Sequence, residues 1–116
     1  MPYLTNALNF MEARKPEPDV EKLEKQGRED MAVMLREAHT DDGTAKDRLE
    51  KIQRIVGYYH LEWGTRSKDP AKRIEAEARR GMASDVWHAL SKLNGASVDE
   101  KLACVRGIVE KVITSQ

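Results

Sequence analysis

The chain has 116 residues, enough for one domain, and its 20 basic residues balance its 20 acidic residues at neutral pH. Because the formal net charge is zero, no overall field draws the chain to nucleic acid or to an anionic membrane. Charged residues make up 34% and hydrophobic residues 40%, a mixture typical of amphipathic helices. No apolar run is long enough to span a bilayer, and Cys104 is the only cysteine, so we expect a cytoplasmic protein without an internal disulfide.

The first segment with helical spacing runs from Thr5 to Arg14, and Pro16 and Pro18 follow it. Proline lacks a backbone donor and restricts the residue before it, so the short helix ends there. We therefore expect residues 1–18 to form a helical arm with a proline-containing linker, ahead of a helical domain over residues 19–116.

Four longer segments follow, each with apolar residues at steps of three and four. They are predicted over residues 19–39, 45–63, 70–93 and 98–113. Capping residues and glycines separate them. The caps are Thr44 with Asp47, Asp69 with Pro70, and Ser97 with Glu100, and the glycines are Gly43, Gly64 and Gly95. Short connections favour antiparallel neighbours, so the sequence predicts an all-α fold, an antiparallel up-down four-helix bundle behind the N-terminal arm.

The outward face of the second long segment carries apolar residues. Tyr58 and Leu61 lie roughly opposite its buried stripe, with Gly57 and Gly64 beside them, and Val33 is an outward apolar residue on the first segment. Glycine within a helix costs about 1 kcal/mol against alanine, so close contact with another chain would explain the two glycines. The alternatives are scattered apolar surface residues, or contact with the N-terminal arm.

A polar cluster is a second candidate site. Glu24 and Glu75 are predicted near the apolar stripes at one end of the bundle, with Arg79 one turn after Glu75, and Tyr59 and His60 arriving at the same level. Such a cluster would suit a metal ion, a small anion or general acid–base chemistry. The alternative is a satisfied network, in which Glu75 pairs with Arg79 and Glu24 accepts from the Tyr59 hydroxyl.

Asp85 and His88 lie one turn apart on the third segment and form a weak candidate for metal binding. Two ligands are fewer than the three that catalytic zinc usually takes from protein, so the alternative is an exposed surface pair. The sequence predicts no resident cofactor, and it contains no glycine-rich nucleotide-binding loop.

The stretch Met82–Leu90, with the turn and helix after it, resembles the all-α nucleotide pyrophosphohydrolases of the MazG type. That family holds magnesium with Glu-x-x-Glu on one helix and Glu-x-x-Asp on another. In this sequence Met82 stands three residues before Asp85, where the family has glutamate. Two acidic pairs at the family's spacing lie upstream, outside its usual arrangement: Glu21 with Glu24, and Asp47 with Glu50. The resemblance implies a degenerate metal- or nucleotide-handling bundle.

Basic residues gather around the connection before the third segment, where they could contact nucleic acid, although the balanced composition disfavours it. They are Arg66, Lys68, Lys72, Arg73 and Arg80. We expect a small helical interaction or assembly protein, a homodimer or a binder of another protein, rather than an enzyme. The alternative is the metal- or nucleotide-handling bundle.

Overall fold

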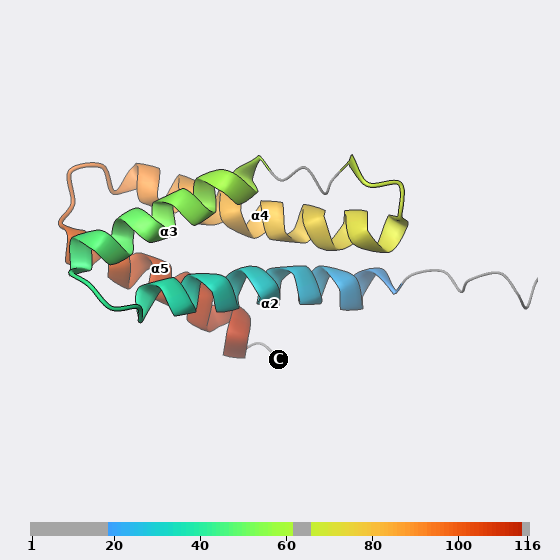
Figure 1. The fold of residues 1–116 in the computed structure, drawn as a ribbon, viewed down its shortest axis with the longest axis horizontal. Coiled ribbons are helices and arrows are strands. Elements are labelled where there is room, and N and C mark those ends of the chain that lie inside the picture. Colours follow the sequence, from blue (N-terminus) through green and yellow to red (C-terminus); the bar gives the residue numbers. More distant parts are fainter. Residues whose placement is uncertain (1–18, 62–65, 115–116) are drawn as a thin grey trace, which may run out of the picture.

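The computed structural model describes residues 19–61 and 66–114, and these residues are all-α. The helices are α2 (Val20–His39), α3 (Ala45–His60), α4 (Pro70–Lys92) and α5 (Val98–Thr114) (Figure 1). The predicted all-α class is confirmed, and the packing of the helices is consistent with a bundle. The predicted arm, the end of the second segment at Trp63 and the stop at Gly64 lie outside the described residues. None of the described helices is both long and apolar enough to cross a membrane.

The helices begin at the predicted capping residues. Thr44 Oγ1 accepts from the backbone N–H of Asp47 at 3.1 Å, and Asp47 Oδ2 accepts from the backbone N–H of Thr44 at 3.2 Å. This capping box satisfies two donors that a helix leaves without an intrahelical partner. Asp69 caps α4, with Pro70 at the first helical position, and Ser97 accepts from the backbone three residues into α5.

Apolar side chains from all four helices form one core. None of the described polar or charged side chains is buried, so the core is held by hydrophobic burial and close packing. Its largest fully buried side chains are Met31, Leu35, Ile52, Val56, Val86 and Val105.

Helices α2 and α4 approach each other closely at Gly27. A Cβ atom at this position would lie 2.4 Å from the backbone oxygen of Glu75 and 2.8 Å from the Cβ of Ala78. Neither of these atoms can rotate out of the way, so only glycine allows this approach.

The bundle is thinner at one end than at the other. The first turns of α2 and α4 extend past the ends of α3 and α5 (Figure 1). Asp30 of α2 and Arg79 of α4 lie 3.9 Å apart between the two extending helices. A side chain near the start of α2 therefore has α4 as a neighbour but is not enclosed by the other helices.

Candidate functional site

The outer face of α3, defined here as Tyr58 and Leu61, carries two large apolar side chains in solvent. Tyr58 is 65% exposed and Leu61 is 66% exposed. The helical repeat produces this arrangement, because burying Ile52 and Val56 turns Tyr58 and Leu61 away from the core. The spacing predicted their exposure, and their role in an interface remains a prediction.

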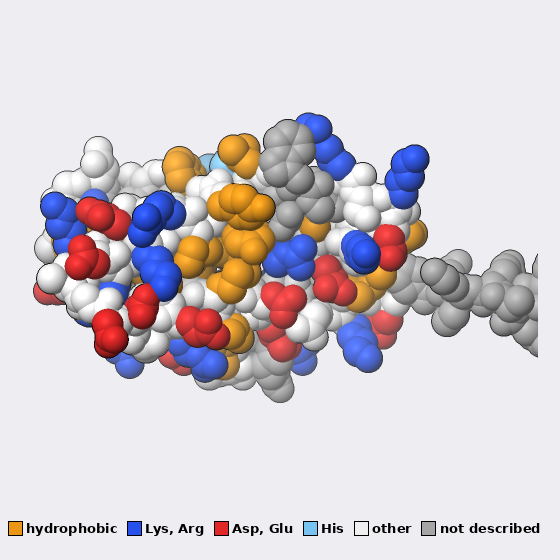
Figure 2. Space-filling view, viewed as in Figure 1, with side chains coloured by type: hydrophobic (Ala, Val, Ile, Leu, Met, Phe, Trp, Pro, Cys, Tyr) orange, Lys and Arg blue, Asp and Glu red, His pale blue; other side chains and the backbone are white. Residues whose placement is uncertain are grey.

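Tyr59 lies beside this face, and other apolar side chains are exposed on the described helices. The rings of Tyr58 and Tyr59 meet edge to face, with centroids 5.0 Å apart, and Tyr59 is half-buried against the core. Figure 2 shows apolar side chains gathered in a band over the end of α3 and the middle of α2, between areas of mixed charge. Val33 of α2 is 37% exposed. Contiguous apolar surface bordered by charge is typical of interaction sites.

Gly57 is not part of the open face. A Cβ atom there would meet Cζ3 of Trp87 at 3.8 Å, so the indole ring of α4 lies over this glycine. The structure thus gives this half-buried glycine a neighbour within the chain, and its contact with another chain stays a prediction. Since 3.8 Å is ordinary van der Waals contact, alanine would also fit.

Trp87 belongs to a small cluster between α3 and α4 that the sequence did not reveal. Its ring stacks on His60, with centroids 5.5 Å apart and planes 7° from parallel. His60 Nδ1 in turn lies 2.9 Å from Ser84 Oγ. The indole, 44% exposed, is thus held in a defined orientation. The contact depends on how far α3 and α4 are displaced along each other, which the spacing of residues within one helix does not give.

The predicted convergence of carboxylates on His60 does not occur among the described residues. Glu24 is exposed, because the start of α2 lies at the thin end of the bundle. His60 lies beside Ser84, which is nine residues, or about 14 Å along the helix, from Glu75. Arg79 is half-buried, with Nη1 3.9 Å from Asp30 Oδ2. Tyr59 packs against the core, and His60 is therefore separated from the level of Glu75 on α4.

The two weak candidates for metal binding, Asp85 and His88, have no third potential metal ligand grouped with them among the described residues. Asp85 and His88 are exposed on α4, and within residues 19–61 and 66–114 no three His, Cys, Asp or Glu side chains are grouped to hold a metal ion. Met82, at the position where MazG-type enzymes have glutamate, is buried in the core. Cys104 is half-buried as a free thiol.

The basic residues around the start of α4 are not equally exposed. Arg73 is half-buried, and its Nη1 donates to the backbone oxygen of Ser67 at 3.2 Å, so this guanidinium helps to hold the connection before α4. The others are exposed: Arg66, Lys68, Lys72 and Arg80.

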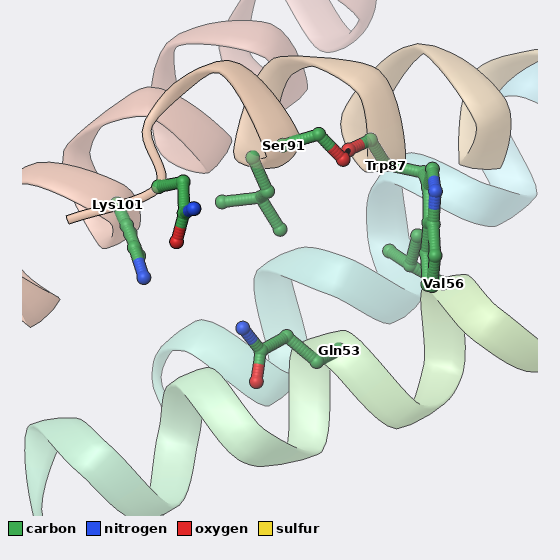
Figure 3. A pocket seen from close by; sticks show the side chains of 7 residues that line it. Gln53, Val56, Trp87, Ser91 and Lys101 are labelled. Atoms are coloured by element: carbon green, nitrogen blue, oxygen red, sulfur yellow. Dashed lines mark hydrogen bonds between the residues drawn. The ribbon is translucent and has the colours of Figure 1, made fainter. Parts of the chain in front are cut away.

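An open hollow of about 540 Å³ lies between α3, α4 and the start of α5. Figure 3 shows the Trp87 ring at one end and Lys101 at the other, with Gln53 and Ser91 on facing sides. Val56, Leu90 and Asn94 complete its lining. Three helices contribute to this hollow, so the periodicity of any one helix does not predict it.

Comparison of the chain with models of protein families, with curated proteins and with solved structures finds no match. Among the described residues, the outer face of α3 and the hollow between α3, α4 and α5 are two surfaces that could take a partner or a ligand.

Proposed function

We propose that the chain is a small helical interaction protein that forms a homodimer through the outer face of α3. The observation that carries this proposal is the exposure of Tyr58 in the last turn of α3 and of Leu61 at its C-cap, each about two-thirds open to solvent. Aromatic residues are enriched at the centres of protein interfaces, and charged residues are depleted there. A second protein with an apolar surface is the alternative partner.

An up-down antiparallel arrangement of the four helices is the scaffold that we propose for this face. The start of α2 contacts the start of α4 at Gly27, and the end of α3 meets the middle of α4 at His60. The end of α2 meets the start of α5, where His39 Nε2 lies 3.2 Å from the backbone oxygen of Leu102. These three contacts support alternating helix directions. We propose a cytoplasmic setting, in which Cys104 as the single cysteine stays reduced.

The strength of association follows from the area available. Burying a fully exposed leucine contributes about 1.5–3 kcal/mol, so the exposed two-thirds of Leu61 contributes about 1–2 kcal/mol. Tyr58 offers a similar or larger apolar area and a hydroxyl group for the edge of an interface. In a twofold dimer each contribution occurs twice. The gain from these side chains is about 4–8 kcal/mol before the cost of association, so we expect weak dimerisation with dissociation in the micromolar range or above.

The test is the solution mass of the native chain, measured by sedimentation equilibrium across concentrations that bracket this range. The native chain should pass from monomer to dimer, and the double variant Tyr58→Glu with Leu61→Glu should stay monomeric at every concentration.

The control double variant places glutamate at two other exposed helical positions, Gly81→Glu with Ala103→Glu. It adds the same charge outside the outer face of α3, so it should dimerise like the native chain. If the native chain is monomeric at every concentration, the homodimer proposal is wrong. A Tyr58/Leu61 double variant that dimerises as well as the control places the interface elsewhere.

A further inference from the structure

We propose that the hollow between α3, α4 and α5 is a binding site for a small carboxylate with an apolar body. This site is separate from the outer face of α3, and the proposal does not depend on dimerisation. Its volume of about 540 Å³ lies within the range of small-molecule pockets, about 300–1,000 Å³.

The apolar body of the ligand fits the side of the hollow nearest Trp87. Leu90 is half-buried against the core and keeps surface open to the hollow, whereas Val56 is fully buried behind it and offers no surface to a ligand. The indole ring forms an upright wall beside Val56 (Figure 3). An aliphatic or aromatic group against this wall would remove apolar surface from water on both sides.

The Trp87 ring has a contact within the chain on the side of α3. It stacks on His60, which is hydrogen-bonded to Ser84. This contact favours the orientation in which the ring lines the hollow, which lowers the entropic cost of binding.

The other end of the hollow favours a single negative charge. Lys101 is the one charged residue in the lining, no carboxylate lines it, and no ion pair of Lys101 is found among the described residues. Lys101 follows Asp99 and Glu100 in the first turns of α5, and neither of these carboxylates lines the hollow. The side-chain amides of Gln53 and Asn94 supply neutral N–H donors beside it. One cation with amide donors suits a carboxylate better than a doubly charged phosphate.

The experiment is an NMR titration of the ¹⁵N-labelled full chain with 4-phenylbutyrate, and in parallel with the neutral 4-phenylbutanamide. The carboxylate should shift the Trp87 indole N–H, the side-chain amides of Gln53 and Asn94, and the backbone N–H of Ser91. Because the amide lacks the negative charge, its affinity should be lower than that of the carboxylate by about fivefold or more.

Two lysine variants test the charged end. Lys101→Met should weaken 4-phenylbutyrate binding by about fivefold and leave the weak binding of the amide unchanged. Lys92→Met removes an exposed lysine that does not line the hollow, so it should bind like the native chain. The Tyr58→Glu with Leu61→Glu variant should also bind normally, which separates this site from the outer face of α3.

Equal affinities for the carboxylate and the amide in the native chain would overturn the proposal without any variant. So would shifts confined to residues outside the hollow, or no shifts at all. Equal losses in Lys101→Met and Lys92→Met would show a general charge effect and overturn it too. Circular dichroism of each variant is the control that its helical content matches that of the native chain.

Discussion

The contact of α2 with α4 at Gly27 makes the sharpest prediction about stability. Alanine at this position would place a methyl group 2.4 Å from the Glu75 backbone oxygen and 2.8 Å from the Ala78 Cβ. Ordinary contact begins near 3.4 Å, so the two helices must move apart by about 1 Å. The displaced atoms belong to the backbone and to a rigid Cβ, so a change of rotamer does not relieve the overlap.

Two opposing effects set the size of the change in unfolding free energy. Alanine is favoured over glycine within a helix by about 1 kcal/mol. Overpacking a close contact costs about 1–3 kcal/mol and sometimes more, and a gap of 1 Å also forfeits a quarter to a half of the dispersion energy of each separated contact. We expect packing to win: an overpacking cost of about 1–3 kcal/mol, less about 1 kcal/mol of helix propensity, lowers the free energy of unfolding of Gly27→Ala by up to about 2 kcal/mol.

The matched control is Gly81→Ala on α4. Gly81 is exposed, and a Cβ atom there meets nothing within 4 Å, so only helix propensity acts. This variant should raise the free energy of unfolding by about 0.5–1 kcal/mol. Urea unfolding followed by helical circular dichroism measures both changes. If Gly27→Ala stabilised the chain as Gly81→Ala does, the close approach of α2 and α4 would be refuted.

Two further predictions concern the connection between α2 and α3 and the cap that follows it. Thr44→Ala removes the hydroxyl that accepts from the Asp47 backbone N–H, so it should destabilise the chain by about 0.5–2 kcal/mol in urea unfolding. Thr114→Ala, at the last residue of α5, is the control and should cost less; equal losses would contradict the capping box. The hydrogen bond from Lys51, then the backbone N–H of Asp42 and the charge of Lys51, lower the pKa of Asp41 below its ordinary value of 3.8. The resulting stabilisation is present above pH 3.8 and is lost as the pH falls through the lowered pKa. A carboxyl NMR titration should show the Asp41 pKa rising in Lys51→Met, and an unchanged value would contradict the ion pair.

The sequence was sufficient to predict the helices and their caps because these depend on local chemistry. Thr44 with Asp47 and Asp69 with Pro70 act between residues close in the chain, and the structure shows these pairs at the predicted helix starts. The apolar periodicity of α3 likewise separated buried Ile52 from exposed Tyr58.

Contacts between helices were harder to predict, because helical periodicity gives the angle of a side chain but not its level along a neighbouring helix. Glu24 has an angle close to that of the apolar stripe, yet it is exposed because α3 and α5 do not reach the start of α2. The sequence predicts His60 at the level of Glu75 if α4 begins at the level where α3 ends. Instead it lies beside Ser84 and Trp87, well along α4. The hollow beside Trp87 depends on the same displacement.

The most direct test of association through the outer face of α3 is the change in backbone NMR spectra of the native chain on dilution. Between about 1 mM and 10 µM, a range that spans micromolar dissociation, the amide signals of Tyr58 and Leu61 and of their neighbours on α3 should move together. The signals of Gly81 and Ala103 should stay in place. Spectra that do not change, or changes confined to other helices, would contradict the account.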